Sequence, residues 1–271
     1  MTFDDLHPRR FFLETWQNID RHAESERVQR SSYDYRPLLV YAWGAVCLTL
    51  MEYIGNTGGF EAFLQLAAIP IEPSWRYYEL ATYVWWTGWR VTGYFLLPVA
   101  FVWLVLRERI RAYGLQIQGM REHLWMYILF FVAVFGCILV ISRHEAFVDY
   151  YPFYTQADQS WAELLAWEIM YIGQFFALEF FFRGFLLVPC KAAMGSSAIF
   201  AMTVPYTLIH FDKPMLEVFA AIVAGVVLGT LAMRTRSILS GFMIHSAVAV
   251  SMDLVSLLRR SSLPSTLWPK I

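Results

Sequence analysis

Apolar residues in this chain are gathered into long runs, which short polar segments separate. Many of the runs reach roughly 18 residues or more, the length at which a helix rising ~1.5 Å per residue crosses ~30 Å of hydrocarbon. The pattern therefore predicts an all-α fold, a polytopic membrane helical bundle with about seven, between six and eight, transmembrane helices. The predicted spans cover residues 37–54, 81–106, 124–142, 162–188, 196–210, 214–233 and 237–258.

Polar and helix-breaking residues divide the chain into four predicted regions. The first span ends at Asn56-Thr-Gly-Gly, where two glycines favour a turn. Residues 60–75 are apolar but short, and they predict a segment at the membrane interface. The four regions are a polar tail with an amphipathic helix (1–36), the N-terminal transmembrane helices (37–160), the transmembrane helices that carry the candidate catalytic residues (161–258), and a short C-terminal tail (259–271).

Composition supports residence in a membrane. Hydrophobic residues make up 58% of the 271 positions and charged residues only 16%, whereas soluble domains average about 25% charged. The net charge of −1, without a basic tract, predicts no nucleic-acid partner, and the lipid bilayer is the expected surrounding. Cys47, Cys137 and Cys190 are far apart in the sequence and predict packing residues, because they have no metal-ligand spacing.

The positions of Lys and Arg predict the orientation. The N-terminal tail, the loop after residue 106, Lys191 and the turn at Arg234 and Arg236 fall on one side of a seven-span chain, which is then cytoplasmic. We therefore expect an integral protein of a bacterial inner membrane with its N-terminus in the cytoplasm. Arg259 and Arg260 fall on the opposite side, an exception to the rule.

Ionisable residues inside the apolar runs are the candidates for function, because each costs ~2.5–3.5 kcal/mol on insertion scales. Glu179 and Arg183 share a helix face at i and i+4, His210 ends the fifth predicted span, and His245 and Asp253 lie in the seventh. Each has a structural alternative: an ion pair between helices, an interfacial histidine, an interhelical hydrogen bond, or a solvated helix end. Together they are the residue types of a general acid–base hydrolase.

Three further glutamates, Glu163, Glu168 and Glu217, are weaker candidates. A structural or solvated role is favoured for each of them. Glu217 is the next candidate for a general base after Glu179.

Three motifs resemble those of the CAAX protease and bacteriocin-processing family. The segment Leu178-Glu179-Phe-Phe-Phe-Arg183-Gly-Phe-Leu resembles the first motif, in which glutamates precede an arginine. Tyr206, four positions before His210, resembles the second, and His245 on a late helix resembles the third. The resemblance covers about residues 160 to 255, in order and in spacing, and the stretch from His210 to Glu217 also resembles bacterial branches of the family.

The resemblance implies an intramembrane glutamate-type endopeptidase without an obligatory metal or other cofactor. Its substrates would be membrane-anchored or lipidated proteins, cleaved near the C-terminus. We expect Glu179 to act as base, His210 to orient the water, Arg183 to hold Glu179, and His245 to donate to the oxyanion. The expected supporting residues are Tyr206, Asp253 and Glu217. A zinc site at Glu179, His210 and His245 remains open, because the ligands would come from three helices.

Two departures from the family pattern keep other functions open. Leu178 stands where the family has the first glutamate of its pair, and Ala249 stands where it usually has asparagine. These two residues favour the main alternative, a catalytically inactive scaffold, chaperone or immunity factor of the same fold. A transporter is a third alternative, which the lack of internal repeats disfavours. Convergence of Glu179, His210 and His245 on one cavity would favour the enzyme.

Overall fold

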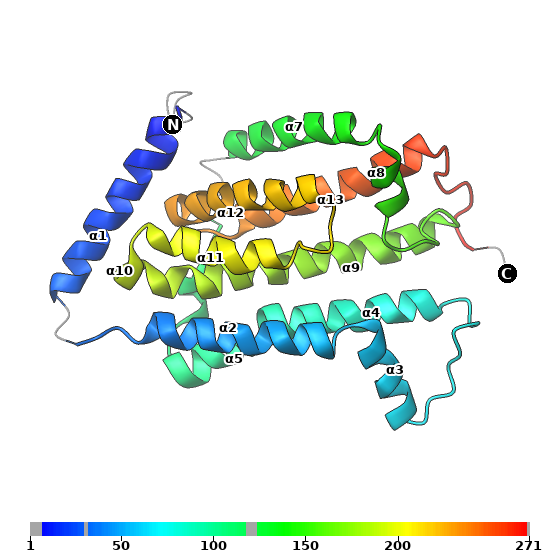
Figure 1. The fold of residues 1–271 in the computed structure, drawn as a ribbon, viewed down its shortest axis with the longest axis horizontal. Coiled ribbons are helices and arrows are strands. Elements are labelled where there is room, and N and C mark those ends of the chain that lie inside the picture. Colours follow the sequence, from blue (N-terminus) through cyan, green and yellow to red (C-terminus); the bar gives the residue numbers. More distant parts are fainter. Residues whose placement is uncertain (1–6, 30–31, 118–123, 270–271) are drawn as a thin grey trace. The chain divides into compact units, whose positions relative to one another are not determined.

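The computed structural model describes residues 7–29, 32–117 and 124–269, so parts of both predicted tails lie outside the described residues. Within these ranges the chain is helical and contains no strand (Figure 1). The α-helices are α1 (Thr15–Gln29), α2 (Arg36–Tyr53), α3 (Thr57–Leu66), α4 (Tyr78–Val91), α5 (Leu97–Phe101), α7 (Leu124–Ile141), α8 (Glu145–Tyr150), α9 (Trp161–Glu179), α10 (Lys191–Met194), α11 (Ser197–Leu208), α12 (Met215–Thr235) and α13 (Leu239–Arg259). Four π-helical segments, η2 (Arg9–Glu14), η3 (Thr92–Leu96), η4 (Val102–Leu106) and η6 (Phe180–Leu186), and two 3₁₀ segments, η5 (Ile110–Tyr113) and η7 (Val188–Cys190), adjoin them.

The predicted all-α polytopic bundle is confirmed. In the part of the chain that the structure describes, five helices are long and apolar enough to cross a membrane, or six if the bent pair α2–α3 counts as one span. The five candidates are Tyr78–Leu106, Leu124–Ile141, Trp161–Met194, Met215–Thr235 and Leu239–Arg259.

The difference from seven predicted spans lies in two of them. The span predicted at 196–210 is α11, which has 12 residues and a length of about 18 Å, too short to cross ~30 Å of hydrocarbon. The span predicted at 37–54 is α2, which bends by 73° into α3. Asn56 explains this break, because its side chain accepts a hydrogen bond from Gly59 N (2.8 Å) and begins α3 as an N-cap.

The helices form two compact units. The first unit contains Met1–Val46, Leu96–Tyr127 and Glu179–Phe242, and the second contains Cys47–Phe95, Ile128–Leu178 and Met243–Ile271. Each unit is described by itself below.

In the first unit, α11 and α12 lie side by side (Figure 1). Two glycines of α12 allow this close approach. A Cβ at Gly225 would stand 2.7 Å from Thr203 Cγ2, and one at Gly229 would stand 3.0 Å from Ile199 Cγ2. Small residues at helix contacts are typical of membrane proteins, because the backbones approach closely there.

In the second unit, α7, α8 and α13 share a hydrophobic core that includes Ile138, Phe147, Tyr151 and Val255.

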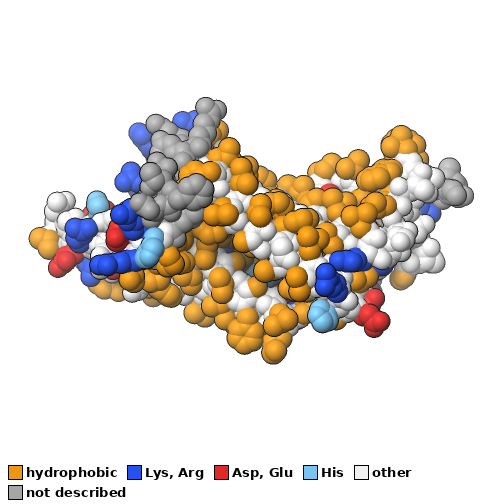
Figure 2. Space-filling view, turned by 90° about the horizontal axis from the view of Figure 1, so that it is seen from above, with side chains coloured by type: hydrophobic (Ala, Val, Ile, Leu, Met, Phe, Trp, Pro, Cys, Tyr) orange, Lys and Arg blue, Asp and Glu red, His pale blue; other side chains and the backbone are white. Residues whose placement is uncertain are grey.

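Many other large apolar side chains, in both units, are exposed, and they cover much of the face shown in Figure 2. Exposed apolar surface on this scale is expected of helices that face lipid.

The second unit also explains the exceptional basic pair at the end of α13. Arg259 donates to Ser142 Oγ (3.3 Å) and to the Leu139 carbonyl (3.4 Å) at the end of α7. Arg260 donates to the Tyr151 carbonyl. Both arginines therefore bind backbone carbonyls at a helix end or in a turn. This is a structural role, which the counting of Lys and Arg in loops does not consider.

Candidate catalytic site

Glu179 is the last residue of α9, and Arg183 lies one turn on in η6. Both side chains are completely buried, and Arg183 Nη1 lies 3.2 Å from Glu179 Oε1. All seven residues of η6 are buried as well. A buried ion pair is costly unless its geometry is good, and π-helical segments occur often at functional sites. The structure thus places Arg183 against Glu179, as their spacing of four residues on one helix face predicts.

Arg183 also joins η6 to α11. Its guanidinium carbon lies 4.0 Å from the centre of the Tyr206 ring, within range of a cation–π interaction. Tyr206 is buried and packs edge-on against Phe182, with ring centres 5.1 Å apart. Tyr206, which we expect to support the site, thus lies directly against Arg183, the partner of Glu179.

His210 lies in the turn just after α11. Its Nδ1 is 2.7 Å from the Tyr206 carbonyl oxygen. A carbonyl oxygen can only accept, so Nδ1 carries the proton, and Nε2 of the neutral ring is a hydrogen-bond acceptor. The arrangement leaves His210 able to accept a hydrogen bond from water, which the expected role requires.

Gly241 was not singled out in the sequence, and it lies against Glu179. A Cβ at this position would overlap with Glu179 Oε2 and stand 2.9 Å from its carboxyl carbon. The carboxylate therefore occupies space that any side chain at position 241 would fill. The sequence did offer one indication of this contact. A glycine near the start of a transmembrane helix often marks a place where another part of the chain approaches the backbone closely.

His245 and Asp253 belong to the second unit, on α13. The His245 ring stacks on Phe175 of α9, with ring centres 4.4 Å apart and an interplanar angle of 27°. Asp253 is completely buried, and its Oδ2 accepts a hydrogen bond from Trp167 Nε1 (2.7 Å). The structural alternative of a solvated helix end is therefore wrong for Asp253. Trp167 had not been identified as its partner.

Leu178 and Ala249, the two departures from the family motifs, are buried, at 5% and 4% exposed. Both lie in the second unit. Each is an apolar side chain at a buried position, and neither can accept or donate a proton.

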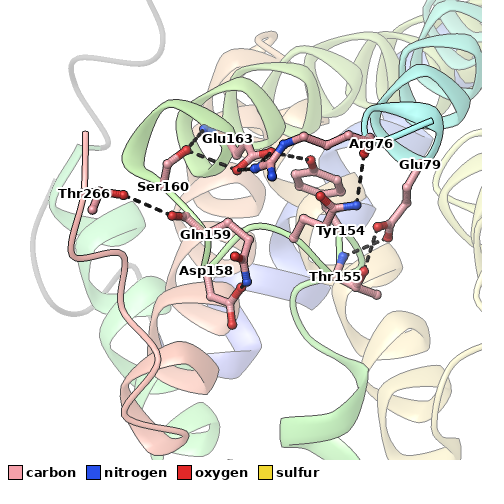
Figure 3. Close-up of polar contacts among 10 residues, drawn as sticks. Arg76, Glu79, Tyr154, Thr155, Asp158, Gln159, Ser160, Glu163 and Thr266 are labelled. Carbon is pink, nitrogen blue, oxygen red and sulfur yellow. Dashed lines mark hydrogen bonds and ion pairs between the residues drawn. The ribbon is translucent and has the colours of Figure 1, made fainter. Parts of the chain in front are cut away.

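Glu163 and Glu217 have structural partners. Glu163 accepts hydrogen bonds from Arg76 (3.3 Å), Tyr154 (3.3 Å) and Ser160 (3.2 Å) at the start of α9 (Figure 3). Burial and the nearby Glu163 carboxylate raise the pKa of Tyr154. Glu217 lies 3.7 Å from Lys213 Nζ in the first turn of α12. The favoured structural reading of Glu163 agrees with these contacts.

Glu168 differs from the other glutamates. It lies on α9 in the second unit and is 7% exposed. Neither of its carboxyl oxygens has a hydrogen-bond partner among the described residues.

Contacts within the first unit connect four of the predicted residues in a series: Glu179 pairs with Arg183, Arg183 stacks on Tyr206, and the Tyr206 carbonyl binds His210. His245 lies in the second unit, and its meeting with Glu179 and His210 stays a prediction. Within neither unit do three or more described His, Cys, Asp or Glu side chains form a group that could hold a metal ion.

Comparison with known proteins gives one family. Residues 160–251 match the family model of the type II CAAX prenyl endopeptidase Rce1-like proteins. The matched segment contains Glu179, Arg183, Tyr206, His210 and His245, and it ends two residues before Asp253. No curated protein and no solved structure matches the chain. Over residues 160–251, therefore, the chain is similar to the Rce1-like type II CAAX prenyl endopeptidases, which confirms the resemblance to the CAAX protease and bacteriocin-processing family drawn from the three motifs.

Proposed function

We propose that this integral membrane protein is an active endopeptidase that cleaves membrane-anchored or lipidated proteins near their C-termini. The observation that carries the proposal is Glu179, a completely buried carboxylate in a candidate membrane span, held by Arg183 within the segment that matches the endopeptidase family. A charged pair at such a position is expensive, so a function is the expected reason for its presence.

In the proposed mechanism, Glu179 accepts a proton from a water molecule, and the oxygen of that water attacks the scissile carbonyl carbon. His210 orients the water by accepting a hydrogen bond at Nε2, because its Nδ1 proton is engaged by the Tyr206 carbonyl. Arg183 fixes the direction of the carboxylate and takes no part in proton transfer. When the tetrahedral intermediate collapses, the C–N bond breaks, and Glu179 returns the proton to the leaving amine.

His245 completes the proposed mechanism as the donor to the oxyanion. A preformed donor at this point is worth about 10²–10³ in rate in other acyl-transfer enzymes. Stacking on Phe175 restrains the ring, and a restrained donor needs little reorganisation during the reaction.

The direct test is Glu179→Gln. Glutamine keeps the shape and an oxygen acceptor but cannot serve as the base, so cleavage of a native substrate by the purified, membrane-reconstituted variant should be lost. Substrates would first be identified by comparing membrane-protein C-termini in cells with and without the protein. Glu217→Gln is the matched control and should retain activity, because Glu217 pairs with Lys213 in the first turn of α12.

Three results would redirect this proposal. Cleavage by Glu179→Gln together with loss in Glu217→Gln would move the base to Glu217. Loss of wild-type activity with a zinc chelator, restored by added zinc, would favour the metal alternative at Glu179, His210 and His245. Identical C-termini with and without the protein would favour the inactive scaffold, which the buried apolar Leu178 and Ala249 support.

We further propose a bacterial inner membrane and a cytoplasmic N-terminus. In the first unit, Arg10 of the N-terminal segment lines the same pocket as Lys191, Arg234 and Arg236. The N-terminal segment and the C-terminal ends of these two candidate spans therefore share one end of the unit, and the excess of positive charge there favours the cytoplasmic side.

A further inference from the structure

A polar pocket of about 290 Å³ lies in the first unit, and Glu179 is not among the residues that line it. It is formed by η2 and α1 and by residues at the C-terminal ends of two candidate spans. Its lining includes four cationic side chains, Arg10, Lys191, Arg234 and Arg236, and one carboxylate, Glu14.

Two of these four cations have no anionic partner among the described residues. Lys191 and Arg236 make no ion pair with any residue that the structure describes. Lys191 is half-buried, so its ammonium group loses part of its hydration without gaining a protein anion. Such a group is stabilised by an anionic ligand.

The pocket is a built feature, because α1 is held against α10 and α12 (Figure 1). Asp20 accepts hydrogen bonds from Ser196 N (2.7 Å) and Ser196 Oγ (3.0 Å). Trp16 Nε1, one turn before Asp20, donates to Thr230 Oγ1 of α12 (3.0 Å). The turn after α12 is held as well, because Gln116 donates to the Arg236 carbonyl (2.7 Å).

The position of the pocket at the ends of two candidate spans predicts that it lies at the depth of lipid headgroups. Lys191 is near the end of the candidate span Trp161–Met194, and Arg234 and Arg236 are at the end of the candidate span Met215–Thr235. The ends of transmembrane helices lie at the interface between hydrocarbon and water, where the phosphates of the lipids are.

We propose that this pocket binds the phosphate-bearing headgroup of an anionic membrane phospholipid. Arginine matches phosphate oxygens with two parallel hydrogen bonds, and lysine adds a point charge. Basic pockets between helices at the cytoplasmic end are a known mode of such binding. The ligand fixes η2, which continues into α1, on the span ends by joining Arg10 to Lys191 and Arg236. This inference does not depend on proteolytic activity.

The test measures lipid binding to the purified full-length protein in a non-ionic detergent. Phosphatidylglycerol is titrated and bound lipid is counted by native mass spectrometry, with phosphatidylcholine and inorganic phosphate as parallel arms. We expect the double variant Lys191→Gln/Arg236→Gln to bind phosphatidylglycerol about 30-fold more weakly, from ~1 kcal/mol per cation and ~1.4 kcal/mol per factor of ten. The matched control is Arg109→Gln/Arg111→Gln, which removes two exposed cations outside the pocket and should bind like the wild type.

A third variant, Glu14→Gln, gives an effect of opposite sign. Removing the one carboxylate of the pocket should strengthen phosphatidylglycerol binding, an outcome that misfolding cannot imitate. Equal losses in the pocket and control variants would reduce the effect to general surface charge and overturn the proposal. Equal binding of phosphatidylcholine, or a match by inorganic phosphate alone of the thermal stabilisation that phosphatidylglycerol gives, would overturn it as well.

Discussion

The Glu179 carboxylate lies directly against Gly241 of α13, in the space that a side chain at position 241 would occupy. The carboxylate and such a side chain exclude each other. The first residue-scale prediction concerns this contact. Gly241→Ala should displace the Glu179 carboxylate, lowering cleavage about 10²-fold, as misplacement of a reacting group by ~1 Å does. Overpacking should also cost about 1–3 kcal/mol of stability.

Gly173→Ala is the matched control for this change. Gly173 lies on the same helix as Glu179, and a Cβ there meets nothing within 4 Å. Rates of substrate cleavage and unfolding temperatures would be measured side by side. Full activity in Gly241→Ala would show that the carboxylate position is unimportant for the reaction.

Asp253 supplies the second residue-scale prediction. It is buried and bound to Trp167. We expect it to help fix the orientation of His245 without contacting the substrate, as partners of catalytic groups do. Asp253→Ala should lower cleavage about ten- to a hundred-fold, by analogy with the partners of metal ligands. Asp253→Asn should retain most of the activity, because an amide oxygen still accepts from the indole N–H.

The rate and the unfolding temperature together separate two roles for Asp253. Trp167→Phe removes the same hydrogen bond from the other side and should lower stability by about 1–3 kcal/mol. Wild-type cleavage rates in both Asp253 variants would assign the residue to structure alone.

At the scale of elements, the contact of α11 with α12 positions Tyr206, because Tyr206 lies on α11. Gly225→Ala should push α11 away at Thr203, whose Cγ2 and Oγ1 would stand 2.7 and 2.8 Å from the new Cβ. We expect a lower unfolding temperature and a lower rate of cleavage. Adding Thr203→Ala should restore part of both, since it removes the two atoms that clash.

This rescue shows whether Gly225→Ala lowers the rate by displacing α11 or by a general loss of stability. The second substitution alone removes the hydrogen bond from Thr203 Oγ1 to the Ile199 carbonyl (2.8 Å), so by itself it should be slightly destabilising. Additive losses in the double variant would contradict the packing explanation.

At the scale of the whole molecule, the prediction is the orientation in the membrane. Arg109→Cys should be protected from a membrane-impermeant maleimide in intact cells and labelled after permeabilisation. Gln159→Cys should be labelled in intact cells, because position 159 precedes the start of the span that ends near Lys191. Both positions are exposed, and two of the three native cysteines, Cys47 and Cys190, are buried. The parent protein without an added cysteine controls for the exposed Cys137. The reverse labelling pattern would place the N-terminus outside.

The sequence by itself determined the all-α membrane class and the place of each apolar helix, because hydropathy and helix breaks are local properties of the chain. It also singled out Glu179, Arg183 and His210 as candidates, since ionisable residues in apolar runs are rare enough to be noticed. Tyr206 became a candidate only through the resemblance of its spacing from His210 to a family motif. The lengths of α11 and of the α2–α3 pair were less predictable, because the ends of helices depend on packing and capping as well as on composition.

Only the tertiary structure decided which residues lie against the candidates. Gly241 is 62 positions from Glu179, and Trp167 is 86 positions from Asp253. In a membrane protein, the face of a helix that packs on another helix is about as apolar as the face that meets lipid. Hydrophobic periodicity therefore does not reveal which faces meet, and it could not have identified the glycine that leaves room for the Glu179 carboxylate or the tryptophan that binds Asp253.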